Sequence, residues 1–230
     1  MVRVSVVIPI HNMDNGKFFL QRNLDSILKQ TFRDFEVVIT DDSESKEIED
    51  WITESYMKNI DSYPENPRIR YISNVGAKGM ANNSNFAIDQ AYGQLIKILY
   101  QDDYFYDERS LWDIVQHFTP YTMWMVTPCV HDSGDGRFFN EHMPYYSESE
   151  NTIGSPSVLT IRREITDRFD PQFGWLLDLD LYKRLYRKYG KPKILSKVNT
   201  VILLGPHQVT YKLSIEAKAR EHSILAEKYT

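Results

Sequence analysis

Short apolar segments that recur near the start of the chain constrain its fold more than any other feature. The first, "VSVVIPI", is β-branched and apolar on both faces, which is typical of a strand buried in a parallel sheet. Helical stretches with apolar residues at the matching spacing, such as Leu20, Leu24 and Ile27, separate these segments. The alternation predicts an α/β fold with an open, mostly parallel sheet flanked by helices. The predicted strands are 4–10, 35–40, 68–73 and 93–100, and the predicted helices are 18–29, 47–59 and 84–91.

The pattern loosens after Asp107. The segment 131–152 is polar and aromatic, and we expect a long loop there, which in compact domains is usually functional or mobile. Gly190 followed by Pro192 predicts the end of a strong helix. The expected elements are a helix at 110–118, a strand at 121–130, a strand entering a helix at 156–165, a helix at 178–189, one or two strands at 193–205 and a final helix from 212.

Composition excludes several classes of protein. The 230 residues with 42% apolar content suffice for the core of one α/β domain, and the net charge of −5 disfavours a dedicated nucleic-acid duplex binder. The single cysteine, Cys129, forms no disulfide within the chain and fits a reducing compartment. The apolar run at the start is too short for a signal sequence, and no segment is long enough for a membrane span. We therefore expect a cytoplasmic protein with no transmembrane segment.

Paired acidic residues follow two of the predicted strands. Asp41 and Asp42 end one strand, and Asp102 and Asp103 end another. Because ligands of open α/β sheets bind at the carboxyl ends of the strands, these acids are candidate binding residues. Asp102 and Asp103 either hold a divalent cation that neutralises phosphate or lie in a solvated turn. Asp41 and Asp42 either accept hydrogen bonds from a base or ribose or, Asp42 above all, cap the next helix.

Two further acids lie at the start of the helix at 178–189. Helical geometry places Asp178 and Asp180 about 200° apart. Asp178 falls on the inward face with Leu181 and Leu185, where a carboxylate gains from the helix dipole. Asp178 is therefore either a functional acid or an N-terminal cap.

Several motifs together resemble the family-2 glycosyltransferases with the GT-A fold, in both order and spacing, over nearly the whole chain. The motifs are "VSVVIPIHN", "DFEVVITDDSE", "NVGAKGMANNSNFAI", "GQLIKILYQDDYF", "GSPSVLTIRREI", "WLLDLDLYKRL" and "GPHQVTYK". The resemblance implies a Rossmann-like, nucleotide-sugar-binding half at 1–107, and an acceptor-binding half with the C-terminal helix at 108–230 of the same domain.

The resemblance also implies a nucleotide and metal site. Asp103 would bind Mn²⁺ or Mg²⁺, while Asp102 would contact the ribose or share the cation. His207 matches a histidine that often completes the metal site, although a lone histidine is more often structural. Tyr100 occupies a place where many members carry an acid, and Asn82 lies where members often carry an arginine, with Lys78 as a substitute cation. The remaining predicted nucleotide contacts are Pro9, Ile10, His11, Asn12 and, for the base, Asp41.

The catalytic base implied by the resemblance is Asp178. It would accept a proton from an acceptor hydroxyl as that oxygen attacks the anomeric carbon, with inversion. Gly154 and Ser155 match a loop that approaches the donor sugar or acceptor, or they form an ordinary loop-to-strand junction. Trp175 and Leu177 are expected beside the acceptor.

The leading hypothesis is a metal-dependent glycosyltransferase that moves a sugar from a nucleoside-diphosphate donor, a UDP-sugar first of all. The acceptor would be a saccharide, a lipid-linked glycan or a glycoconjugate in surface polysaccharide synthesis. One alternative is a glycosyltransferase that acts on modified bases of DNA, of the viral type. Another is a non-catalytic nucleotide-sugar-binding module. Salt-dependent DNA binding would favour the first alternative. Hydrolysis of the nucleotide sugar, or an Asp178→Asn variant that keeps binding but has no turnover, would separate the leading hypothesis from the second.

Overall fold

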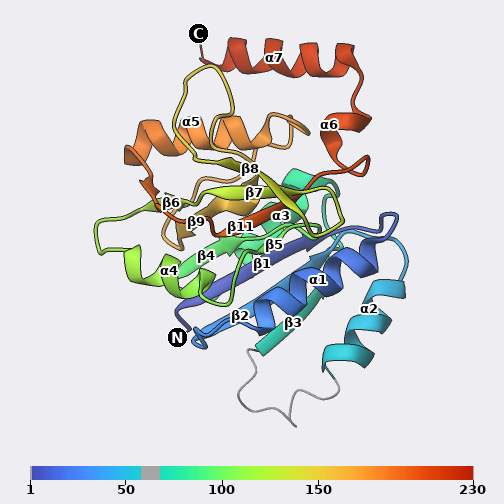
Figure 1. The fold of residues 1–230 in the computed structure, drawn as a ribbon. Coiled ribbons are helices and arrows are strands. Elements are labelled where there is room, and N and C mark those ends of the chain that lie inside the picture. The colour runs from blue at the N-terminus through green and yellow to red at the C-terminus, as the bar shows by residue number, and fades with distance from the viewer. Residues whose placement is uncertain (1, 58–67, 230) are drawn as a thin grey trace.

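The computed structural model describes residues 2–57 and 68–229, and its centre is a seven-stranded sheet with the order β10-β6-β9-β4-β1-β2-β3 (Figure 1). Every neighbouring pair is parallel except those that involve β9. The predicted open, mostly parallel sheet is therefore confirmed, and strands from both sides of residue 107 join it. The strands are β1 (Val4–Ile10), β2 (Phe35–Asp41), β3 (Arg68–Ser73), β4 (Leu95–Ile98), β6 (Trp124–Val126), β9 (Leu159–Arg162) and β10 (Lys193–Ile194).

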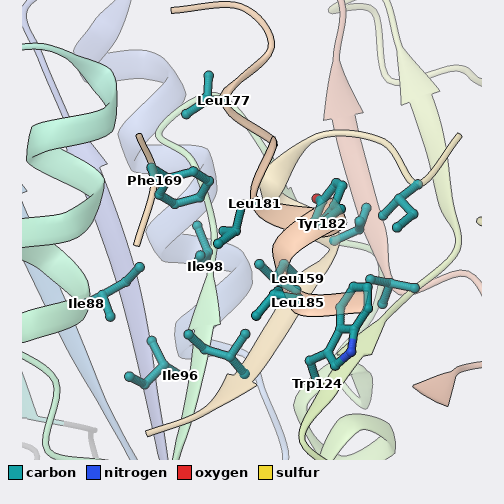
Figure 2. Packing of buried hydrophobic residues seen from close by; sticks show 14 of the residues in the cluster. Ile88, Ile96, Ile98, Trp124, Leu159, Phe169, Leu177, Leu181, Tyr182 and Leu185 are labelled. Carbon is teal, nitrogen blue, oxygen red and sulfur yellow. The ribbon is translucent and has the colours of Figure 1, made fainter. Parts of the chain in front are cut away.

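Helices cover both faces of this sheet. On one face, α1 (Gly16–Leu28), α2 (Glu47–Ile52) and α4 (Ser110–His117) pack against side chains such as Val37 and Ile39. On the other, α3 (Met80–Asp89) and α5 (Leu177–Tyr189) pack against Val38, Ile96 and Ile98. Figure 2 shows Leu181 and Leu185 of α5 directed at Ile98 and Leu159. The alternation of side chains along each strand thus supplies apolar surface to two helical layers.

A second, four-stranded sheet has the order β5-β11-β7-β8. It consists of β5 (Tyr104–Phe105), β11 (Thr200–Leu203), β7 (Cys129–Asp132) and β8 (Phe138–His142). Because β5 directly follows Asp103 and β11 comes shortly before His207, this sheet brings the two predicted metal-binding segments together.

The structure corrects three predictions in the second half. The strand expected at 121–130 is two strands, β6 and β7, which belong to different sheets and are separated by Thr127 and Pro128. Proline cannot donate a ladder hydrogen bond, so the chain changes sheets there. The loop expected at 131–152 contains the end of β7 and all of β8.

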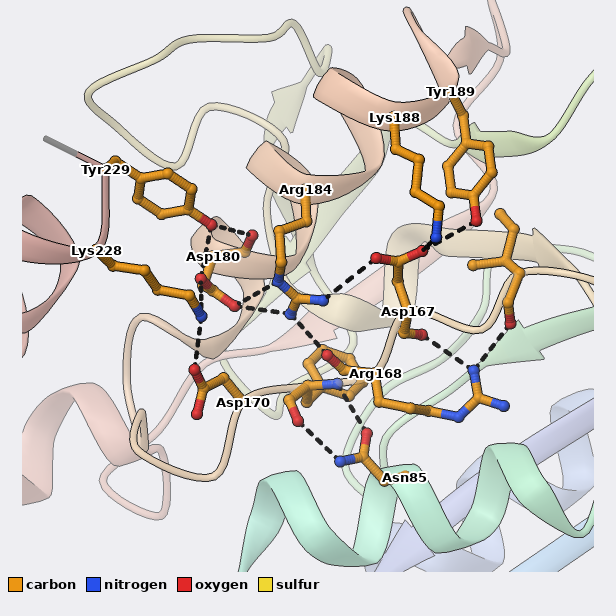
Figure 3. A network of polar contacts seen from close by, with 12 residues as sticks. Asn85, Asp167, Arg168, Asp170, Asp180, Arg184, Lys188, Tyr189, Lys228 and Tyr229 are labelled. Atoms are coloured by element: carbon orange, nitrogen blue, oxygen red, sulfur yellow. Dashed lines mark hydrogen bonds and ion pairs between the residues drawn. The ribbon is translucent and has the colours of Figure 1, made fainter.

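The third correction concerns 156–165, where a short 3₁₀ helix (Pro156–Val158) and β9 are followed by a turn, not by a helix. The chain then continues without regular secondary structure and is held against α3, because the Asn85 side chain both donates to and accepts from the backbone of Phe169 (Figure 3).

The other helix predictions are confirmed with shifted ends. The helix expected at 47–59 is α2, which continues as a π-helix (Thr53–Met57), and residues 58 and 59 lie outside the described residues. The segment at 193–205 is two strands, β10 and β11. The final helix, α7 (Ile215–Tyr229), begins after a short α6 (Val209–Lys212). No helix among the described residues combines the length and the apolar character needed to cross a membrane.

We predict that Leu185→Ala lowers the free energy of unfolding by about 2–5 kcal/mol. Leu185 is fully buried between α5 and the sheet, so truncation leaves a cavity as well as removing apolar contacts. Urea denaturation followed by circular dichroism measures the change. Ile215→Ala, at an exposed position of α7, is the matched control and should change stability by no more than about 0.5 kcal/mol. A loss below about 1 kcal/mol for Leu185→Ala would contradict the packing described.

Candidate active site

A cavity of about 920 Å³ opens at the carboxyl ends of β1 and β4 and extends to the start of α5 and to α6. Most of the predicted site residues line it, although they come from distant parts of the sequence. These are Pro9, Ile10, His11, Asp102, Asp103, Gly154, Ser155, Trp175, Leu177, Asp178 and His207. Four predicted nucleotide contacts are not part of the lining: Asn12, Asp41, Lys78 and Asn82.

Asp102 and His207 form a direct pair in this cavity. The Nε2 atom of His207 lies 2.9 Å from Oδ2 of Asp102. The imidazole also packs against the Phe19 ring of α1, with the ring centroids 4.9 Å apart. The turn after β4 and the loop after β11 therefore present one carboxylate and one imidazole at the same point.

The neighbouring Asp103 is buried, with only 2% of its surface exposed. Its Oδ1 accepts the backbone N–H of Leu203 at 3.0 Å, and its Oδ2 accepts the Ser155 hydroxyl at 3.3 Å. Burial and the adjacent Asp102 charge raise the pKa of Asp103 well above its usual value. Asp103 lines the cavity, and its hydrogen bonds also connect the turn after β4 to β11 and to the 154–155 loop.

The donor set fits a divalent cation only if the substrate supplies ligands too. Among the residues that the structure describes, no group of three or more His, Cys, Asp or Glu side chains is arranged to hold a metal. Asp102 and His207 lie close enough together to offer two ligands to one ion. Mg²⁺ sites in nucleotide enzymes typically combine one or two carboxylates with water and substrate phosphates, so two protein ligands are compatible with such an ion.

Of the two adjacent acids at the end of β2, Asp42 lines the cavity and Asp41 does not. Asp41 is buried, and its carboxylate accepts hydrogen bonds from the Ser43 N–H at 2.7 Å and from the Tyr71 hydroxyl. Strand alternation gives the reason: Asp41 falls in the same parity as Val37 and Ile39, whose side chains face the α1 and α2 layer. That parity was a signal available in the sequence.

Lys78 and Asn82 are not part of the cavity lining and contact neighbouring protein groups instead. The Lys78 ammonium donates to the Asn74 carbonyl at 2.7 Å and lies 3.4 Å from the Asp42 carboxylate. The Asn82 amide donates to the Lys78 carbonyl. A different cation, Lys212 at the end of α6, lines the cavity. Burial and the Lys212 charge lower the pKa of His11, which lines the same cavity.

Asp178 lies in the first turn of α5 and lines the cavity. Its Oδ2 accepts the Asn151 amide at 2.7 Å, and its Oδ1 accepts the Leu179 N–H at 2.7 Å. The surrounding protein disfavours the charged form, so burial raises the pKa of Asp178 to about 7. A carboxyl group with this pKa can exchange protons near neutral pH.

A short loop joins Asp178 to Asp103. Asn151 donates to both Asp178 and the Gly154 carbonyl, and the next residue, Ser155, donates to Asp103. Gly154 adopts a φ of +112°, which favours glycine. The Tyr182 hydroxyl of α5 donates to the carbonyls of Gly154 and Ser155. The loop therefore fixes the spacing between the two acids.

Trp175 forms part of the cavity wall next to Asp178. Its indole Nε1 donates to the Thr210 hydroxyl at 3.2 Å, and its ring meets the His222 ring edge-on at 5.5 Å. Sequence reasoning missed the partners Asn151 and His222 and the cavity residue Lys212. Asn151 lies in the segment expected to be a functional loop, but nothing in its local pattern indicated contact with Asp178.

The family model described as "Glycosyl transferase family 2" matches residues 5–186. The chain belongs to glycosyl transferase family 2. The predicted family is therefore confirmed, and with it the prediction of a glycosyltransferase at the level of the family.

This family-2 chain is similar to several curated glycosyltransferases. A hyaluronan synthase of Pasteurella multocida is 29% identical over 225 residues, which cover 94% of this chain and 22% of that protein. A GalNAc(5)-diNAcBac-PP-undecaprenol β-1,3-glucosyltransferase of Campylobacter jejuni is 32% identical over 104 residues, 45% of this chain and 30% of that protein. The chain thus spans less than a third of the length of these relatives.

Solved structures share the fold of the family-2 chain. S. aureus TarS in complex with UDP matches with a TM-score of 0.67 and 18% identity, over 89% of this chain and 61% of that one. A mannosyltransferase of Pyrobaculum calidifontis, in complex with GDP-Man and Mn²⁺, matches with a TM-score of 0.67 and 19% identity, over 100% of this chain and 65% of that one. The predicted GT-A fold is confirmed by these matches.

We predict that wild-type stability falls relative to that of Asp178→Asn as the pH rises from about 4 to 8. The native pKa of Asp178, about 7, exceeds the unfolded value near 3.9. Between these values the native state holds a proton that the unfolded state has lost, so the stabilisation present at low pH disappears as the pH rises through 7. Asn cannot titrate, so the variant lacks this contribution.

Urea denaturation of both proteins across this pH range measures the effect. The change in the stability difference should reach a few kcal/mol at most, since one pKa unit corresponds to about 1.4 kcal/mol. Glu227→Gln, at an exposed position of α7, is the control and should run parallel to wild type. Parallel curves for wild type and Asp178→Asn would argue against the raised pKa.

Proposed function

We propose that the chain catalyses inverting transfer of a sugar from a nucleoside-diphosphate donor to an acceptor hydroxyl. One observation carries the proposal: a single cavity holds Asp178, a carboxyl group with a pKa of about 7, together with the Asp102–His207 pair. The first is suited to accept a proton, and the second to act near the leaving diphosphate. Membership of family 2 supports the same reaction class.

The donor nucleotide would occupy the end of the cavity lined by Pro9, Ile10, His11 and Asp42. We propose Asp42 in place of Asp41 as the acid near the nucleotide base, since Asp42 lines the cavity and Asp41 does not. Lys212 would lie near the diphosphate, where a cation offsets negative charge. The match to TarS in complex with UDP and to a relative bound to GDP-Man is compatible with such a donor. We propose a UDP-sugar.

Asp102 and His207 would hold a Mn²⁺ or Mg²⁺ ion jointly with the diphosphate. When bound, such an ion neutralises the charge that develops on the departing nucleoside diphosphate. Asp103 would hold Asp102 in position, because its hydrogen bonds to Leu203 and Ser155 fix the turn that carries both acids.

Asp178 would act as the general base. Its Oδ2 is oriented by the Asn151 amide, and its Oδ1 by the backbone N–H of Leu179. The ionised form accepts the proton of the acceptor hydroxyl as that oxygen attacks the anomeric carbon, and a pKa near 7 keeps the base available at neutral pH.

Trp175 and Leu177 would hold the acceptor beside Asp178. The similarity to a hyaluronan synthase and an undecaprenol-linked glucosyltransferase supports a saccharide or lipid-linked acceptor.

We predict that Asp178→Asn keeps donor affinity while kcat falls by about 10²–10⁴-fold. In the wild type, kcat should rise with pH and level off above about 7, because the base must be ionised. A thermal-shift screen of UDP-, GDP-, TDP- and CMP-sugars with and without Mn²⁺ first selects the donor, and radiolabelled transfer then gives the rates.

Glu227→Gln is again the control for this experiment and should match the wild-type rate. A near-wild-type rate for Asp178→Asn would refute the base assignment. Donor binding without transfer or hydrolysis by the wild type would favour a non-catalytic binding module. Transfer to modified DNA alone would favour the DNA-directed alternative.

We also predict that Asp102→Asn weakens Mn²⁺-dependent UDP binding by about tenfold or more, since removal of a charged ligand lowers affinity for a hard cation. Isothermal titration calorimetry with UDP, in Mn²⁺ and in EDTA, measures it. UDP affinity in EDTA should differ much less between the two proteins. Equal UDP affinity of the wild type with and without Mn²⁺ would refute the metal site.

A further inference from the structure

The carboxylate of Glu221, on α7, accepts hydrogen bonds from three successive backbone N–H groups. The donors are Gly174 at 2.9 Å, Trp175 at 2.9 and 3.2 Å, and Leu176 at 2.8 Å. Glu221 is 9% exposed, so water competes little for these bonds. A charged side chain from the C-terminal helix therefore fixes three consecutive peptide groups of another segment.

The clamped segment leads directly into α5 and the candidate base. Trp175 and Leu177 line the cavity, and Asp178 follows within the first turn of the helix. The N–H groups that begin a helix lack partners within it, and an anion there is also favoured by the helix dipole. Glu221 accepts the N–H of Leu176, the N-cap residue, and those of the two residues before it, and Leu176 makes no side-chain capping bond of its own.

A second set of contacts holds α7 in place. Lys228 of α7 lies 2.6 Å from the Asp170 carboxylate and 2.7 Å from that of Asp180, and the Tyr229 hydroxyl donates to Asp180 at 2.7 Å (Figure 3). Asp170 and Asp180 lie on either side of the 174–176 segment in sequence. The segment is therefore tied to α7 before, within and after the clamp.

The same C-terminal region also surrounds the Trp175 side chain. Thr210 accepts its indole N–H, His222 meets the ring edge-on, and the Lys218 ammonium lies 5.3 Å from a ring centroid of Trp175. Glu221 fixes the Trp175 backbone, while these three residues fix its ring. The part of the cavity beside Trp175, where the acceptor would bind, therefore packs against α6 and α7.

We infer that Glu221 is a positioning residue for transfer: its carboxylate sets the backbone that presents Trp175 to the acceptor and Asp178 to the acceptor hydroxyl. The inference rests on the proposed function. Displacement of a reacting group by about 1 Å can lower a rate about 10²-fold, so a clamp on this segment has kinetic consequences. The donor nucleotide end of the cavity, lined by Ile10 and Asp42, makes no contact with Glu221 among the described interactions.

The test compares Glu221→Gln with Glu227→Gln, which removes the same charge from an exposed position of the same helix. A glutamine amide has one oxygen acceptor and would direct N–H groups at the remaining backbone donors. For Glu221→Gln we expect kcat to fall about tenfold or more and the acceptor KM to rise severalfold, with the Kd for UDP within twofold of wild type. The acid limb of the kcat profile should also move to lower pH, since the Glu221 charge contributes to the raised pKa of Asp178. Glu227→Gln should match wild type in all four measurements.

Glu221→Asp, which keeps the charge on a shorter side chain, provides a second variant if Glu221→Gln does not fold. We expect the same division between acceptor and donor parameters with a smaller loss of kcat. Unchanged kcat and acceptor KM in a folded variant would overturn the inference, as would an equal loss of UDP binding or the failure of both variants to fold. A wild type that transfers no sugar would refute the proposed function instead, which keeps the two failures distinguishable.

Discussion

The buried carboxylate of Asp103 is the constraint on which the candidate site depends. It accepts a hydrogen bond from the backbone of Leu203 in β11 and another from Ser155, at the start of the 3₁₀ helix before β9. The Asn23 amide of α1 donates to the Asp103 carbonyl at 2.7 Å. Four segments that are distant in sequence therefore meet at one residue. The loop that ends in His207 and the loop that holds Asp178 through Asn151 both take their position from it.

Two adjacent acids at the end of a buried strand are unfavourable by themselves, and the structure divides their roles. Asp103 is withdrawn into the protein, where hydrogen-bond donors satisfy both oxygens, while Asp102 remains at the cavity beside His207. Burial and the Asp102 charge raise the pKa of Asp103, so repulsion between the two acids persists at this turn. A cation that binds at Asp102 and His207 would relieve it, which gives the paired acids a physical reason in a metal-assisted site.

Sequence periodicity was sufficient for the sheet and for most helices, because both depend on local apolar spacing. It failed where a contact joins segments that are far apart. Three features depend on tertiary partners. They are the change of sheet at Pro128, strand β8, and the segment whose backbone is hydrogen-bonded to Asn85. In the site, Asp102, Asp178 and His207, which were selected from the motif order, line one cavity, while their roles stay predictions. The alternation of side chains along β2 would have predicted that Asp42, and not Asp41, lines the cavity. No local sequence pattern predicts the hydrogen bonds of Glu221 to the 174–176 backbone.

The first turn of α5 shows how surroundings assign different chemistry to two acids of the same type. Asp180 is fully buried, yet Arg184, Lys228 and Tyr229 surround its carboxylate and keep it in a structural network. Asp178, two positions earlier, has no ion pair among the described residues and receives only neutral donors from Asn151 and Leu179. Burial without a compensating cation raises its pKa to about 7. The same helix turn therefore supplies one ion-paired anchor for α7 and one carboxyl group able to exchange a proton, and the anchor helps to hold the other in place.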